Sequence, residues 1–190
     1  MSSVTQICNR ALQHLGAARI TDLSEDSRNA RSCNAVYEIA RDAELEAHPW
    51  RFAIKRVALA ADSVSPAFGK ERSFTLPADY MKIMPRDMGR LDIYTDWEIE
   101  GDKIFTDESA PLEIRYIGRI TDVSLFPALF QEALSARIAM ELSEEITQSN
   151  SKIATIAQIY KSKTDQARRA NAFAKRPQVP PEDQYVRVRD

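Results

Sequence analysis

Histidine, cysteine and glycine, from which many catalytic and metal sites are built, are scarce in this sequence. Its 190 residues include two histidines, two cysteines and five glycines. Two thiols without a histidine cluster indicate neither a disulfide framework nor a zinc site. Five glycines leave little for a phosphate-binding loop, and no nucleotide-binding or nucleophile-elbow motif is present. We interpret His14 and His48 as capping or surface residues, and we expect no cofactor, no metal, no catalytic residue and no enzymatic activity.

Long apolar runs are missing as well. No stretch approaches the roughly 20 apolar residues of a membrane-spanning helix. The N-terminus also lacks the basic segment and apolar run of a secretory signal. We therefore expect a protein without a membrane anchor that folds in a reducing cytoplasm.

The chain as a whole has almost no excess of charge of one sign, but two of its segments do. The formal net charge is −2, which gives the chain as a whole no electrostatic footprint for nucleic acid. Residues 91–113 nevertheless hold eight acidic residues and one lysine, whereas residues 152–190 hold nine lysines and arginines against four acids. Opposed patches of this kind suit contacts between stacked subunits, although a solvated face is the simpler explanation of either patch alone.

The clearest pattern lies between residues 126 and 175 and predicts two amphipathic helices. Pro127 suits a first helical turn, because its missing N–H would have no partner there. The first apolar stripe consists of Phe126, Leu129, Phe130, Ala133, Leu134, Ile138 and Leu142. After the polar residues 147–151, the second stripe consists of Ile153, Ile156, Ala157, Tyr160, Thr164, Ala167, Asn171 and Ala174. The short turn predicts that the second helix, about 36 Å long, folds antiparallel onto the first.

Two further helices are predicted near the N-terminus. Ser3 and Gln6 have the spacing of a capping box, and Gly16 supplies a stop for the first of these helices. The second runs to about Ala47. Pro49 ends it, because the residue before a proline is pushed out of the α region.

Between the two helical pairs, the pattern changes to that of strands. Residues 50–54 are bulky and follow a helix stop, so we expect them to lay two aromatic rings over the helices. Ser73 to Leu76 alternate as a short strand, and residues 90–120 alternate with a period of two, with a tight hairpin turn at residues 100–103. These segments predict a small antiparallel sheet of three or four strands.

This order predicts a mainly α protein with a β insert, an α+β fold. We expect residues 1–58 and 119–175 to form an antiparallel four-helix bundle, and residues 59–118 to form the insert with its small sheet and hairpin. Prolines at positions 177, 180 and 181 predict an extended C-terminal arm over residues 176–190. The arm either binds a partner, as an added strand, or is a frayed terminus. Its candidate binding residues are Pro180, Pro181, Tyr185, Val186, Arg187, Val188 and Arg189.

Two charged clusters carry further hypotheses. A glycoside hydrolase needs two carboxylates about 5–10 Å apart, and the candidates are Asp92, Asp96, Glu98, Glu100, Asp102 and Asp107. Any acidic hairpin offers such pairs, so a solvated negative face is the alternative. A basic helix face, which we expect to complement acidic groups of a neighbouring subunit, consists of Lys161, Lys163, Arg168 and Arg169.

Three segments occur in an order that resembles a known family. They are His48-Pro49-Trp50-Arg51-Phe52-Ala53, Phe74-Thr75-Leu76-Pro77-Ala78-Asp79-Tyr80 and Pro127-Ala128-Leu129-Phe130-Gln131-Glu132-Ala133-Leu134. Over nearly the whole chain, the sequence resembles the tail tubular protein A family, the head-to-tail adaptors of short-tailed bacteriophages.

The resemblance implies a structural virion protein that folds and assembles in the host cytoplasm. Its copies, usually twelve, would form a ring between the portal protein and the tail nozzle protein, and double-stranded DNA would pass through the lumen during genome ejection. The arm would grip the portal or an adjacent subunit. The tail-facing hairpin would include Tyr94, Trp97, Glu100, Asp102 and Lys103. Two other functions stay open: a tail-associated polysaccharide or peptidoglycan hydrolase, and a host helical module that binds a peptide in a groove.

Overall fold

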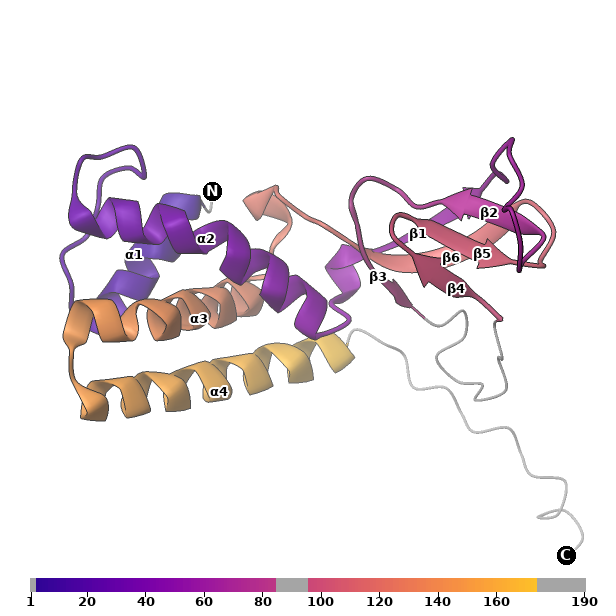
Figure 1. Cartoon of the computed structure of the whole chain (residues 1–190). Coiled ribbons are helices and arrows are strands. Elements are labelled where there is room, and N and C mark those ends of the chain that lie inside the picture. Colours follow the sequence, from indigo (N-terminus) through magenta and orange to yellow (C-terminus); the bar gives the residue numbers. More distant parts are fainter. Residues whose placement is uncertain (1–2, 85–95, 174–190) are drawn as a thin grey trace, which may run out of the picture.

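The computed structural model describes residues 3–84 and 96–173, so residues 85–95 and the C-terminal arm lie outside the described range. Within that range the fold is α+β, with four helices and two small antiparallel sheets. The helices lie at one end of the molecule and the sheets at the other, and the chain passes from helices to sheets and back (Figure 1). Among the described residues, no helix is long and apolar enough to cross a membrane.

Helices α1 (Val4–Leu15) and α2 (Arg28–Ala47) are bounded by local signals. The Ser3 hydroxyl accepts a hydrogen bond from the Gln6 amide at 3.2 Å, and the Gln6 side chain accepts one from the Ser3 amide at 3.1 Å. Gly16 ends α1 with a φ of 74°, a conformation that favours glycine. The predicted capping box and glycine stop are confirmed, as is the end of α2 just before the proline.

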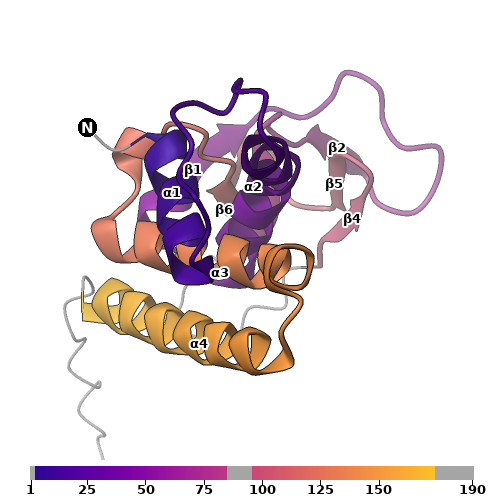
Figure 2. The same ribbon diagram turned by 90° about the vertical axis from the view of Figure 1, so that its left-hand side faces the viewer.

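The C-terminal helices are α3 (Ala128–Thr147) and α4 (Asn150–Phe173). Helix α3 contacts each of the other three helices, and Figure 2 shows it between α4 on one side and α1 and α2 on the other. Nine of the 20 residues of α3 are buried, whereas α4 buries only three of 24, which are Ile156, Thr164 and Ala167. Helix α3 is therefore the centre of the helical part, and α4 lies on its outside.

The predicted apolar stripe of α3 is right for most of its members but incomplete. Leu129 is 39% exposed although it belongs to the stripe. Four small residues outside the stripe are buried as well, namely Ser135, Ala136, Ala139 and Ser143. Because the distance between packed helices depends on the side chains at their contact, these small residues let neighbouring helices approach α3 from several sides.

The β region holds two three-stranded sheets, so the prediction of one sheet is wrong. Sheet A has the order β1-β6-β3 and consists of β1 (Ile54–Leu59), β3 (Tyr80–Met84) and β6 (Leu112–Gly118). Sheet B has the order β2-β5-β4 and consists of β2 (Arg72–Thr75), β4 (Glu98–Glu100) and β5 (Lys103–Thr106). Strand β1 was not predicted, and all of it except Leu59 falls in the range 1–58 that was assigned to the helices. It follows the short helix η1 (Arg51–Ala53) and pairs with β6, far along the chain.

Two hydrophobic cores hold these parts together. One lies among the helices and extends into sheet A through Met84 and Ile117. The other lies between the sheets and includes Phe74 and Ile104, which are fully buried. Because sheet A contributes to both cores, it connects the helices to sheet B.

Candidate interaction surfaces

The predicted hairpin turn is confirmed between β4 and β5. Gly101 sits at its tip with a φ of 59°, and Glu100 and Asp102 beside it are exposed. The Trp97 indole N–H donates to a carboxylate oxygen of Glu108 at 2.8 Å. Tyr94, the other aromatic residue predicted for this surface, lies outside the described residues. The hairpin thus presents a polar, mostly acidic tip, and Trp97, which directly precedes β4, is half-buried.

Lys103 connects the hairpin to the loop between β1 and β2. Its ammonium donates to Asp62 at 2.7 Å, and Asp62 also accepts from the hydroxyls of Ser73 at 2.8 Å and Thr75 at 2.9 Å. The hydrogen bond from Lys103 is the main reason that the pKa of Asp62 falls to about 2. Lys103 therefore has a structural contact within the chain, and Asp62 anchors one edge of sheet B.

The acidic candidates for hydrolysis lie on the surface wherever the structure describes them. Asp96, Glu98, Glu100, Asp102 and Asp107 are all exposed. Lys70 forms ion pairs with two of them, Asp96 and Asp107, and the backbone amide of Glu71 lowers the pKa of Asp107. Asp92 lies outside the described residues.

No metal site accompanies these acids in the part of the chain that the structure describes. Within residues 3–84 and 96–173, no group of three or more histidine, cysteine or acidic side chains is placed to hold a metal ion. The two cysteines, Cys8 and Cys33, are free and fully buried.

The basic face predicted for α4 is not uniform. Lys161 and Arg169 are exposed, and Arg168 is half-buried. Lys163 instead forms an ion pair with Glu132 of α3 at 3.0 Å. Arg10 of α1 binds the same carboxylate through two hydrogen bonds of 3.0 and 3.1 Å. One member of the predicted inter-subunit face therefore fastens α4 to α3.

A buried polar cluster also attaches α4. Glu44 of α2 is fully buried, and its carboxylate accepts from the Tyr160 hydroxyl of α4 at 2.9 Å. Arg137 of α3 lies 3.6 Å from the same oxygen, and the backbone carbonyl of Glu44 accepts from the Trp50 indole at 2.7 Å. This cluster, which we call the Glu44 cluster, joins three helices through polar groups.

An aromatic cluster forms where the helices meet the sheets. Trp50 packs edge-on against Phe130 with ring centroids 5.1 Å apart, and Phe52 does so at 4.9 Å. Phe126 lies 5.0 Å from Phe130 and 5.8 Å from Phe52. The prediction that two aromatic rings follow α2 and cover the helices is confirmed, because Trp50 is buried and Phe52 packs against the helical core.

A groove opens beside these rings, between η1, the start of α3 and the end of α4. It has a volume of about 410 Å³ and is lined mainly by Trp50, Phe52, Leu129, Phe130, Ala167 and Ala170. Asn171 also lines it, and its side chain accepts from the Arg51 amide at 2.9 Å and donates to the Pro49 carbonyl at 3.1 Å. We call this hollow the junction groove. Each lining segment had been predicted, but their meeting depends on the packing of α4 against α3.

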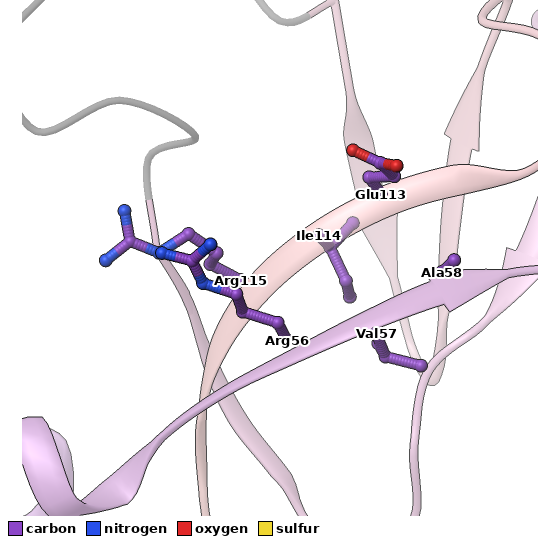
Figure 3. Close-up of a pocket in the computed structure, with 6 residues that line it drawn as sticks. All are labelled: Arg56, Val57, Ala58, Glu113, Ile114 and Arg115. Atoms are coloured by element: carbon purple, nitrogen blue, oxygen red, sulfur yellow. The ribbon is translucent and has the colours of Figure 1, made fainter.

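A second hollow lies on sheet A and is polar. Arg56 of β1 and Arg115 of β6 are directly opposite each other in the strand register. Both side chains extend in the same direction, away from Glu113 and from the apolar pair Val57 and Ile114 (Figure 3). Like charges opposite each other on neighbouring strands repel. The sequence did not indicate this pair, because β1 was not recognised as a strand.

The arm residues proposed to bind a portal or a neighbour, from Pro180 to Arg189, lie outside the described residues. The described part of the chain thus offers four surfaces: the acidic hairpin, the exposed basic positions of α4, the junction groove and the arginine pair of sheet A. No protein-family model and no curated protein matches this chain, so comparison with known proteins assigns no role to any of these surfaces.

Proposed function

We propose that this chain is the subunit of a head-to-tail adaptor ring of a short-tailed bacteriophage. The observation that carries the proposal is the meeting of two resemblance segments at the junction groove. These segments are far apart in the sequence, yet Trp50 of the first contacts Phe130 of the other with ring centroids 5.1 Å apart. The remaining segment, residues 74–80, supplies Asp79, which accepts from the Tyr116 hydroxyl of β6 at 3.0 Å. Each of the three segments therefore makes a contact between parts of the chain that are distant in the sequence.

The finer architecture belongs to the same proposal. The four helices form an antiparallel bundle with the sheets as an insert between α2 and α3, and the bundles pack side by side in the ring. The ring, of about twelve copies by the resemblance, docks beneath the portal at the head–tail junction of the virion, and the hairpin faces the tail nozzle. The protein folds and assembles in the host cytoplasm and acts as a structural component, without a cofactor.

The charge of the chain is compatible with a DNA channel. Genome ejection requires that double-stranded DNA slides past the ring, and a strongly basic lumen would bind its phosphates. The net charge of −2 supplies no such attraction. The exposed basic positions of α4, Lys161 and Arg169, are assigned to contacts with acidic groups of an adjacent subunit.

The proposal is tested with the full chain and purified portal rings of the same phage, by mass measurement and particle imaging. We expect a stoichiometric ring on the portal. Removal of residues 177–190 should weaken or abolish it if the arm grips the portal or an adjacent subunit, and should leave it intact if the arm is a frayed terminus. If the full chain does not bind the portal rings, the adaptor proposal is wrong, and a polysaccharide assay becomes the next measurement.

The tail-facing surface has its own test. The double variant Trp97→Ala with Tyr94→Ala should weaken attachment of the tail nozzle to the ring while the fold survives. A matched control, Val64→Ala, removes an exposed apolar side chain from another loop of the β region. Unchanged attachment in the double variant would show that the hairpin is not the tail-facing surface.

A further inference from the structure

The junction groove is an apolar hollow that the described residues leave open. Its volume of about 410 Å³ is within the range of pockets that hold a small molecule or a few side chains. Leu129, which lines it, is 39% exposed. Apolar surface gathered at one place on a protein marks a binding site.

We propose that the junction groove of one copy binds the C-terminal segment of a second copy, with Tyr185 and Val186 as the inserted side chains. The inference rests on the proposed ring, because it requires copies that stand side by side. It specifies the surface and the segment by which neighbouring subunits recognise each other.

The position of the segment in the chain supports this occupant. Helix α4 ends at Phe173, within one helical turn of the groove residue Ala170. Tyr185 follows 12 residues later, and 12 residues span at most about 40 Å when extended. That reach is similar to the length of α4 itself, about 36 Å for its 24 residues. The segment is therefore long enough to cross from one subunit to a neighbour in contact with it.

The prolines favour the groove of a neighbour over the groove of the same chain. To place Tyr185 in its own groove, the 12 residues that follow Phe173 would have to fold back on themselves. Prolines at positions 177, 180 and 181 favour an extended path instead, which disfavours such a reversal.

The rim of the groove carries a positive charge that can pair with the acids of the segment. The Arg51 side chain is exposed and forms no ion pair with any described residue. Its backbone amide is held by Asn171, so the base of the side chain has a fixed position. Glu182 and Asp183 directly precede the apolar residues of the segment. Burial of Tyr185 and Val186 supplies most of the binding free energy, and a pair between Arg51 and an acid sets the direction in which the segment enters.

Such a contact is heterologous, because a groove on one copy meets a segment on the next. Heterologous contacts produce a closed ring when the rotation that relates neighbouring copies returns to the first copy after a whole number of subunits. Repetition around the ring strengthens the assembly without any new kind of contact, since each further engagement is intramolecular.

The first test uses the full chain and a synthetic peptide of residues 176–190. A segment-deficient variant, Tyr185→Ser with Val186→Ser, leaves the groove free for the peptide, and calorimetric titration should give saturable binding with one peptide per chain. Addition of Ala170→Trp, at an exposed position that lines the groove, should weaken binding at least tenfold. The control is Ala172→Trp, also exposed but outside the lining, which should bind as before. Absence of peptide binding, or equal binding by both tryptophan variants, would overturn the inference.

The second test decides whether the occupant comes from another copy. The groove-blocked variant Ala170→Trp and the segment-deficient variant each lack one half of the contact, so neither should associate alone. Mixed above the dissociation constant of the peptide, they should form heterodimers and nothing larger, as measured by sedimentation velocity. Peptide binding without heterodimers would overturn the assignment to a second copy.

Portal binding, measured in parallel, separates this inference from the adaptor proposal. If the full chain binds portal rings but neither peptide binding nor heterodimers appear, the adaptor proposal stands and the groove inference fails. If the peptide and the heterodimers behave as expected but the portal rings are not bound, the groove inference stands and the adaptor proposal fails.

Discussion

Helices α3 and α4 look alike in the sequence and differ in the structure. Each was predicted to bury one apolar stripe, yet α3 buries nine of its 20 residues and α4 only three of 24. The difference comes from position, because α3 lies between α4 and the N-terminal helices (Figure 2). An apolar stripe shows that a helix packs against something, but it does not show how many neighbours the helix has.

Different kinds of contact also hold the two helices in place. Helix α3 is held mainly by buried apolar side chains, including Phe130, Leu134 and Ile138. Helix α4 adds two polar attachments to its few apolar contacts, namely the Glu44 cluster and the pair between Lys163 and Glu132. Since hydrogen bonds and partly exposed ion pairs contribute less than apolar burial, we expect α4 to be the more weakly attached helix.

The largest effect is expected in α3. Leu134→Ala removes a fully buried side chain from a helix that cannot move into the cavity, because neighbours enclose it on several sides. We expect the free energy of unfolding to fall by about 4–5 kcal/mol, the upper part of the range for such truncations. Chemical denaturation measures the change, and Leu129→Ala, at an exposed position of the same helix, is the control.

A smaller effect is expected for the matched truncation in α4. Ile156→Ala also removes a fully buried side chain, but α4 is free on its outer face and can settle toward α3. We expect a loss of about 2–3 kcal/mol, the lower part of the same range. Equal losses for Ile156→Ala and Leu134→Ala would mean that α4 is held as rigidly as α3, and the comparison would fail.

A smaller effect again is expected when the hydroxyl of Tyr160 is removed. Tyr160→Phe leaves the ring in place but removes the hydrogen bond to the buried carboxylate of Glu44, which we expect to lower the free energy of unfolding by about 1–3 kcal/mol. The same substitution in a Glu44→Ala background should have a smaller effect, because the hydroxyl then keeps only its longer hydrogen bond from Arg137, at 3.4 Å. A full loss in both backgrounds would show that the ring, not the hydrogen bond, was responsible.

The smallest effect is a dependence on pH at the contact of α3 with α4. Burial alone would raise the pKa of Glu132, but hydrogen bonds from Arg10 and Lys163 lower it below its ordinary value of about 4.5. These contacts of the Glu132 carboxylate therefore add their full contribution to the free energy of unfolding above the ordinary pKa. That contribution is lost as the pH falls through the lower pKa of the folded state. Lys163→Met should reduce this acid dependence, which denaturation curves between neutral and acid pH can measure. An acid dependence that is unchanged in Lys163→Met would contradict the prediction.

Local signals were readable from the sequence because they depend on neighbouring residues alone. The capping box of Ser3, the stop at Gly16 and the turn at Gly101 each require only a few positions, and all are found. Strand β1 was missed because its evidence lies in its partner β6, and two sheets cannot be told from one without the pairing.

The same limit applies to the candidate sites. The polar groups of the Glu44 cluster come from α2, α3 and α4, and the junction groove combines residues from η1, α3 and α4. Neither has a sequence motif of its own. The opposed arginines of sheet A required a strand register that the sequence did not provide. Sites formed by distant segments become visible only when the packing is known.

The two tryptophans of the chain fall into different parts of the molecule. Trp50 is 2% exposed at the base of the junction groove, whereas Trp97 is half-buried beside the hairpin of sheet B. Each part therefore carries its own fluorophore, and Trp97→Phe or Trp50→Phe leaves one optical signal for a single part. The emission of Trp50 reports on the helices and on any occupant of the groove. The emission of Trp97 reports on the surface proposed to meet the tail, so the two variants allow the two parts of the molecule to be observed separately during assembly.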